Sequence, residues 1–182
     1  MNQTDTLKIL NKYKILLIVI LGGIFLALGT NDNIINFDQN DSKSDFIISV
    51  PKIDVKAPVL IGVDPKTPDV YQKELTKGVA HMVGTAMPGE KGNVFIYGHS
   101  SSEIKSRYDK IFEKLDELET NDEILVKYKQ TRYNYVVSEK KIVEKDDFSV
   151  LEQDGPERVT LMTCWPLGTT DQRFIVVANR KI

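Results

Sequence analysis

Short runs of β-branched and aromatic residues, broken by glycine and proline, make up most of the chain after residue 45. Runs of this kind are typical of half-buried strands. Helices are expected only in short pieces, at 69–77, 108–118 (a short amphipathic helix or a turn) and 146–153. Repeated short strands with few helices predict an all-β fold, a closed or nearly closed barrel. The expected strands begin near Phe46 and Ala57 and continue at 93–99, 122–128, 131–143, 158–163 and 173–178.

The single cysteine of the chain, Cys164, stands at the end of one expected strand. The next residues, Trp165 to Gly168, break the strand because they include a proline, which cannot donate a backbone hydrogen bond. Arg173 opens the following strand nine residues after Cys164, so a thiol and a guanidinium flank one loop. A lone cysteine is more often a small buried hydrophobe. The loop and the nearby arginine favour a reactive thiol instead.

Nucleophilic catalysis by a thiol also needs an acid or a base, and the chain offers two histidines. His99 closes the strand-like run that starts at Asn93, so its imidazole is expected at a strand end, as is Cys164. His81 lies in the glycine-punctuated segment 78–89, where a hydrogen-bonded structural role is the better interpretation. His99 is therefore the candidate partner of Cys164.

Four motifs in this chain resemble those of the sortase family, in the same order. Thr160–Cys164 is similar to the TLxTC signature, and Gly92–His99 is similar to the segment that carries the catalytic histidine. Arg173 falls where the catalytic arginine of the family does, and Pro51–Pro58 resembles the opening strand. The similarity covers about 46–182. It implies a sortase-like β-barrel as the catalytic domain.

This resemblance also implies an activity, a substrate and roles for three residues. Cys164 would cleave an LPxTG-type sorting signal on a secreted protein and form a thioester, which an amine of a peptidoglycan precursor or a pilin would resolve. His99 would act as general acid. Arg173 would donate hydrogen bonds to the substrate carbonyl or the oxyanion. The Cys-to-Arg spacing resembles the pilin-polymerising and related smaller classes, but no aromatic lid precedes Phe46, so the class stays open.

Two other functions are alternatives, and the first of them uses the same three residues. A thiol protease or amidase would pass the same thioester to water, and only product analysis separates it from a transpeptidase. A non-catalytic, membrane-tethered binding module would instead have an unreactive thiol and would tolerate Cys164→Ala.

The amino-terminal part of the chain indicates a membrane location. Residues 1–14 carry three lysines and are expected to form a cytoplasmic tail, 15–30 an uncharged transmembrane signal anchor, and 31–45 a flexible linker. The small residues Ala27 and Gly29 leave a cleaved signal peptide as the alternative. Both interpretations place the catalytic domain at 46–182 outside the cytoplasm, where an unpaired cysteine fits a free reactive thiol.

Composition argues against other classes of partner. The net charge of −2 and the lack of a basic cluster interleaved with aromatic residues speak against nucleic acid. The acidic residues from Glu113 to Glu119 lack the spacing of an oxygen-ligand loop and are interpreted as a solvated face. We therefore expect no metal and no cofactor.

Overall fold

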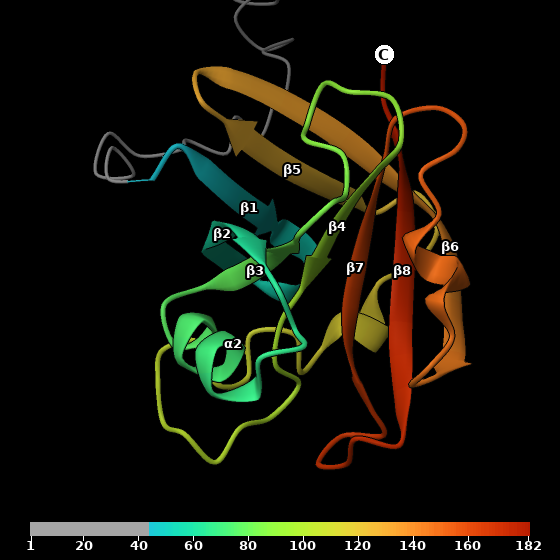
Figure 1. Cartoon of the computed structure of the whole chain (residues 1–182). Helices are drawn as coiled ribbons and strands as arrows, with labels where there is room; N and C mark the ends of the chain where they lie inside the picture. The colour runs from blue at the N-terminus through green and yellow to red at the C-terminus, as the bar shows by residue number, and fades with distance from the viewer. Residues whose placement is uncertain (1–43) are drawn as a thin grey trace, which may run out of the picture. The chain divides into compact units, whose positions relative to one another are not determined.

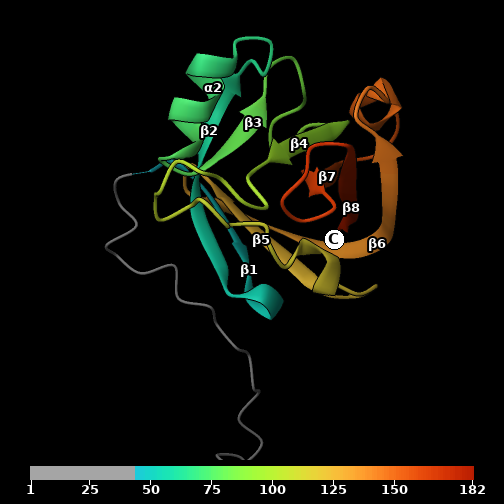
Figure 2. The ribbon, with the colours of Figure 1, turned by 90° about the horizontal axis from the view of Figure 1, so that it is seen from below.

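The computed structural model describes residues 44–182, whose eight strands form a closed barrel. The order around the barrel is β1-β2-β3-β4-β7-β8-β6-β5, and pairing of β1 with β5 closes it (Figures 1 and 2). This confirms the all-β barrel predicted from the sequence. The tail, the anchor and nearly all of the linker lie outside the described residues. Within 44–182, no helix is both long enough and apolar enough to cross a membrane.

Seven of the eight strands within 44–182 follow the expected runs closely, and the eighth, β3, forms in the glycine-punctuated segment 78–89, where no strand was expected. The strands are β1 (Phe46–Val50), β2 (Val55–Val63), β3 (Val79–Met82), β4 (Asn93–Tyr97), β5 (Glu123–Tyr128), β6 (Thr131–Glu144), β7 (Arg158–Trp165) and β8 (Gln172–Arg180). The helical pieces of this part of the chain are α2 (Pro68–Leu75) and the 3-10 turns η2 (Pro51–Ile53), η3 (Leu115–Glu117) and η4 (Phe148–Leu151).

Two of the strand pairs are parallel, β2 with β3 and β4 with β7. The second pair sets Tyr97 of β4 opposite Met162 of β7. Because parallel strands run in one direction, the chain leaves β4 and β7 at the same edge of the sheet. The residues that follow β4 therefore lie beside the end of β7.

Strand β4 is buried on both faces. Val94 and Ile96 point into the barrel core, whereas Phe95 and Tyr97 belong to a second apolar cluster on the outer face. This outer cluster includes Leu75 of α2, which lies beside β2 and β3 in Figure 1. Burial on both faces explains why the sequence of β4 is a nearly continuous run of apolar residues.

The helix considered for 108–118 does not form. Residues 107–114 make turns, and only the 3-10 turn η3 follows them. The backbone N–H of Phe112 donates to the carbonyl of His99 (2.9 Å) instead of to a helical partner. Phe112, Leu115 and Leu118 still pack in the barrel core. The spacing of apolar residues in this segment therefore indicates buried side chains and not an α-helix.

Candidate active site

His99 follows β4 by two residues on a tightly held backbone. Gly98 donates its N–H to the carbonyl of Met162 (3.1 Å), and His99 accepts from Phe112 on the other side. A Cβ on Gly98 would lie 3.0 Å from side-chain atoms of both Ile111 and Phe112. Contacts that short would force the neighbouring side chains to shift, so glycine allows the loop with Ile111 and Phe112 to approach this backbone closely.

Cys164 and Arg173 are direct partners in the antiparallel pair of β7 and β8. Residues opposite each other in such a pair present their side chains on the same face of the sheet. The alternation of β7 puts Cys164 on the outer face with Met162, which packs on the outer cluster. The thiol is free and partly exposed. The candidate residues are thus outside the barrel, not in its core.

The guanidinium of Arg173 is held by backbone carbonyls. Its Nη1 donates to the carbonyl of Thr170 (3.0 Å) and to that of Gln172 (2.8 Å). Asp171, the alternative partner considered from the sequence, is not in an ion pair with Arg173 in the part of the chain that the structure describes. Arg173 is therefore positioned beside the thiol without a carboxylate that would neutralise it.

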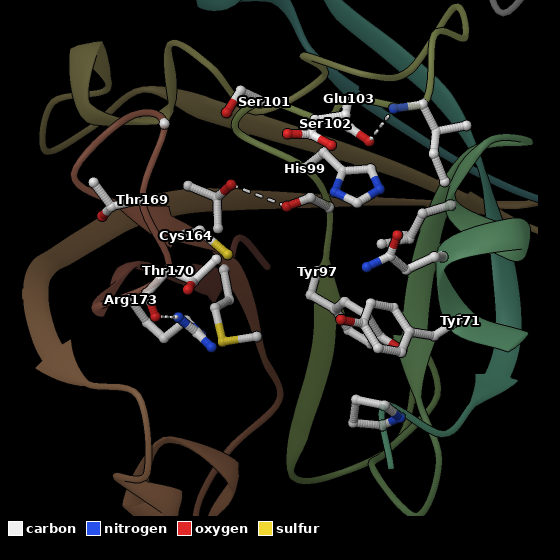
Figure 3. Close-up of a pocket in the computed structure, with 18 of the residues that line it drawn as sticks. Tyr71, Tyr97, His99, Ser101, Ser102, Glu103, Cys164, Thr169, Thr170 and Arg173 are labelled. Carbon is white, nitrogen blue, oxygen red and sulfur yellow. Dashed lines mark hydrogen bonds between the residues drawn. The ribbon is translucent and has the colours of Figure 1, made fainter. Parts of the chain in front are cut away.

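One cleft of about 800 Å³ brings Cys164, His99 and Arg173 together (Figure 3). The structure thus places all three residues selected from the sequence at one site, although they come from three separate segments. We call this hollow the cleft. The rest of its lining is Pro65, Tyr71, Gln72, Leu75, Tyr97, Gly98, Ser101–Lys105, Met162, Thr163 and Gly168–Thr170.

A buried hydrogen bond ties the two halves of the site together. The hydroxyl of Thr163, next to Cys164, donates to the carbonyl of Gly98, next to His99 (2.9 Å). Thr163 is 4% exposed, so water is not at hand to replace this bond. The bond therefore helps to set the position of the imidazole relative to the thiol.

We expect Thr163→Val to destabilise the protein and to impair the site. Valine has the same shape but leaves the Gly98 carbonyl without its donor, which costs about 1–3 kcal/mol of unfolding free energy. Urea unfolding measures this loss. Thr160→Val is the matched control, because Thr160 is a buried threonine of the same strand that does not bond to Gly98. Equal stability of the two variants would contradict the role given to this bond.

The environment of His99 keeps its imidazole neutral. Burial lowers the pKa of His99, and the carboxylate of Asp109 opposes this effect by raising it. Nε2 is buried and makes no hydrogen bond to any residue from 44 to 182. A neutral imidazole with a free nitrogen is ready to accept a proton.

The pKa of His99 is expected to lie below the ordinary value of about 6.5, and lower still in Asp109→Asn. The reason is that burial disfavours the imidazolium, and the mutation removes the charge that favours it. NMR titration of the imidazole in a Cys164→Ala background measures the value without coupling to the thiol. Asp116→Asn serves as the control. An unchanged pKa in Asp109→Asn would contradict this account.

His81 plays the structural part expected from the sequence. It is 2% exposed, and its Nε2 lies 3.0 Å from the carbonyl of Ala86 and from the hydroxyl of Thr85. The Thr85 hydroxyl donates to Met82, which agrees with an Nε2–H that donates to Ala86. Among residues 44–182 no group of three or more His, Cys, Asp or Glu side chains is arranged to hold a metal ion.

A second hollow, which we call the groove, adjoins the cleft and was not resolved by sequence reasoning. It has a volume of about 740 Å³ and shares Pro65, Met162 and Arg173 with the cleft. From the sequence, the segments 76–92 and 140–156 are candidates for substrate specificity, but one sequence gives no way to rank their residues. The other residues lining the groove come largely from these segments and are Asp64, Lys66, Met82–Thr85, Phe95, Val143, Lys145, Asp147, Phe148, Val150 and Leu151.

Comparison with known proteins places the chain in a family. The model of the sortase domain matches residues 48–181. The chain belongs to the sortase family. It is 28% identical to Sortase D of Bacillus subtilis (strain 168) over 80% of this chain and 68% of that sortase. It is 26% identical to Sortase A of Bacillus anthracis, over 72% of this chain and 57% of the relative.

Solved sortase structures agree with this assignment. The pilus-related Sortase C of Group B Streptococcus has a TM-score of 0.66 and 30% identity, over 78% of this chain and 69% of that one. Sortases are cysteine transpeptidases and are generally membrane-associated and extracytoplasmic. Because the relatives carry the names Sortase A, C and D, likeness alone does not select a subclass.

Proposed function

We propose that this sortase cleaves an LPxTG-type sorting signal on secreted proteins and transfers the acyl group to an amine. In this proposal Cys164 is the nucleophile, His99 the acid and base, and Arg173 the donor to the oxyanion. The observation that carries the proposal is the meeting of these three side chains at one cleft on the outer face of the barrel.

The first half of the reaction starts from a thiol and a neutral imidazole. The thiolate, not the thiol, is the nucleophile, so the proton of Cys164 must be removed. His99 takes the proton of Cys164, and the thiolate attacks the carbonyl carbon of the threonine in the signal. The C–N bond then breaks, and the imidazolium returns the proton to the leaving amine. The product is a thioester on Cys164.

Arg173 stabilises the charge that develops on the substrate oxygen. A guanidinium stays protonated in proteins, so Arg173 cannot act as a base. Backbone carbonyls occupy Nη1. The N–H groups on Nε and Nη2 stay available for an oxyanion. Because the guanidinium is braced before substrate binds, little reorganisation is needed in the transition state.

The groove is the proposed site of the sorting signal. It ends at Arg173, beside Cys164, and does not include His99. Its lining is largely apolar, with Phe148 and Val83 both more than half exposed, which suits the leucine and proline of the signal. Thus the signal would reach the thiol from the side away from the histidine.

The proposed setting is the outer face of the cell membrane. Residues 15–30 would form a single-pass anchor, with 1–14 in the cytoplasm and 31–45 as the linker. The acyl donors would be secreted proteins with a C-terminal sorting signal. The acceptor would be an amine of a peptidoglycan precursor or of a pilin. Family membership supports this setting in its general form.

Mass spectrometry of the products tests the proposal. The full chain in detergent is incubated with an LPxTG-type peptide, with and without triglycine. We expect a thioester on Cys164 and a ligated peptide that forms only when triglycine is present. A hydrolysed peptide alone, at every triglycine concentration, would favour the protease alternative. An intact peptide and an unmodified Cys164 would overturn the proposal.

A further inference from the structure

The cleft extends beyond the thiol, on the side away from the groove. Ser101–Lys105, the segment after His99, line the cleft but not the groove. We call the part of the cleft between this segment and Tyr71 of α2 the arm (Figure 3). If the sorting signal occupies the groove, as in the proposed function, then the arm stays open to a second substrate.

The chemistry of the second half-reaction requires a substrate in the arm. The leaving amine takes its proton from His99, so it departs on the side of the histidine. The incoming amine reaches the same carbonyl carbon and returns a proton to the same imidazole, so by microscopic reversibility it arrives on that side. The acceptor therefore binds beside His99, where Ser101–Lys105 form the wall.

Charge singles out one residue of this wall. Glu103 is the only carboxylate in the lining of the cleft, and in the described part of the chain it makes no hydrogen bond or ion pair of its own. The other charged groups in the lining, Lys105 and Arg173, are cationic. Nζ of Lys105 lies 3.7 Å from Asp109, so within residues 44–182 this lysine pairs with Asp109 and not with Glu103.

We propose that Glu103 binds the acceptor as an ammonium ion and holds it beside His99. Near neutral pH an alkylamine arrives protonated, and two cations in the cleft would repel it if Glu103 were absent. The bound ammonium first releases one proton to water, and the amine nitrogen then attacks the thioester carbon while His99 takes a second proton from that nitrogen. A C–N bond forms, the C–S bond breaks, and the Cys164 thiolate recovers the proton from His99.

The test compares two acceptors in the full chain and its variants. Triglycine amide is an ammonium ion near neutral pH, whereas hydroxylamine is uncharged. Glu103→Gln is expected to raise KM for triglycine amide about two- to fivefold, with KM for hydroxylamine unaltered. Glu103→Lys is expected to raise KM for triglycine amide further. Added salt is expected to shrink the difference in this KM between the parent and the variants. Glu117→Gln, at an exposed position outside the cleft, is the matched control.

Each outcome decides the proposal. Equal KM values for triglycine amide in the parent and in Glu103→Gln would overturn it. A similar rise in KM for triglycine amide and for hydroxylamine in Glu103→Gln would also overturn the proposal. Such a result would show that the mutation changes the shape of the cleft and not its charge. The intact mass of the parent after donor peptide alone is measured in parallel. A missing thioester there would overturn the proposed function and this inference with it.

Discussion

Replacing Cys164 with alanine is expected to lower kcat/KM for peptide ligation at least about 10³-fold. The chain holds no second thiol that could form the acyl intermediate. Because Cys164 is partly exposed on the outer face, its loss leaves the barrel core intact, and thermal unfolding should confirm a folded protein. Product formation is measured by chromatography of the ligated peptide.

Cys164→Ser provides a sharper form of the same test. It keeps a hydroxyl of similar size, but serine is a far weaker nucleophile than a thiolate near neutral pH. Ligation should therefore fall almost as far as in Cys164→Ala. A thiol-directed probe should label the parent faster than free cysteine. If Cys164→Ala ligated the peptide at nearly the parent rate, Cys164 would not be the nucleophile, and a non-catalytic role for this residue would be favoured.

The second large effect is expected at Arg173. Replacement by alanine removes a braced donor to the oxyanion and should lower kcat about 10²- to 10³-fold. Replacement by lysine keeps the charge but loses the planar fork of the guanidinium, so rescue should be partial. Steady-state kinetics with the donor peptide separate the effect on kcat from that on KM.

Arg107→Ala is the matched control for this prediction. Arg107 is an exposed arginine that packs on Tyr108 and does not line the cleft. Its removal should alter kcat little. If Arg173→Ala raised KM alone, the guanidinium would bind substrate without stabilising the transition state. Full rescue by lysine would mean that charge suffices and that the carbonyl bonds at Thr170 and Gln172 are incidental.

The barrel could be predicted because most of its strands carry runs of apolar or alternating residues that indicate burial. Seven of the eight strands were expected with small errors at their ends, such as β7, which continues through Trp165, whereas β3 in the glycine-punctuated segment 78–89 was missed. The segment 108–118 shows the limit of local patterns. Its apolar spacing fits several kinds of turn, and the distant acceptor His99 for the Phe112 N–H decides among them.

The candidate site could be predicted in its members but not in its construction. Cys164, His99 and Arg173 were chosen because each stands near the end of a strand. Their meeting depends on the parallel pairing of β4 with β7, which no local pattern encodes. The segments that line the groove could be named but their residues could not be ranked, and Glu103 had no signal at all, since one glutamate in an exposed loop gains a meaning only from the side chains around it.

The parallel pairing of β4 with β7 also sets the order in which the protein becomes reactive. A ribosome completes β4 well before β7, and the bond from Thr163 to Gly98 spans 65 residues. Until β7 is in place, His99 has no thiol beside it. Cys164 in an unfinished barrel is an ordinary cysteine without a proton acceptor or a braced arginine. On the proposed mechanism, the reactive site is therefore assembled only after β7 has paired with β4 and β8.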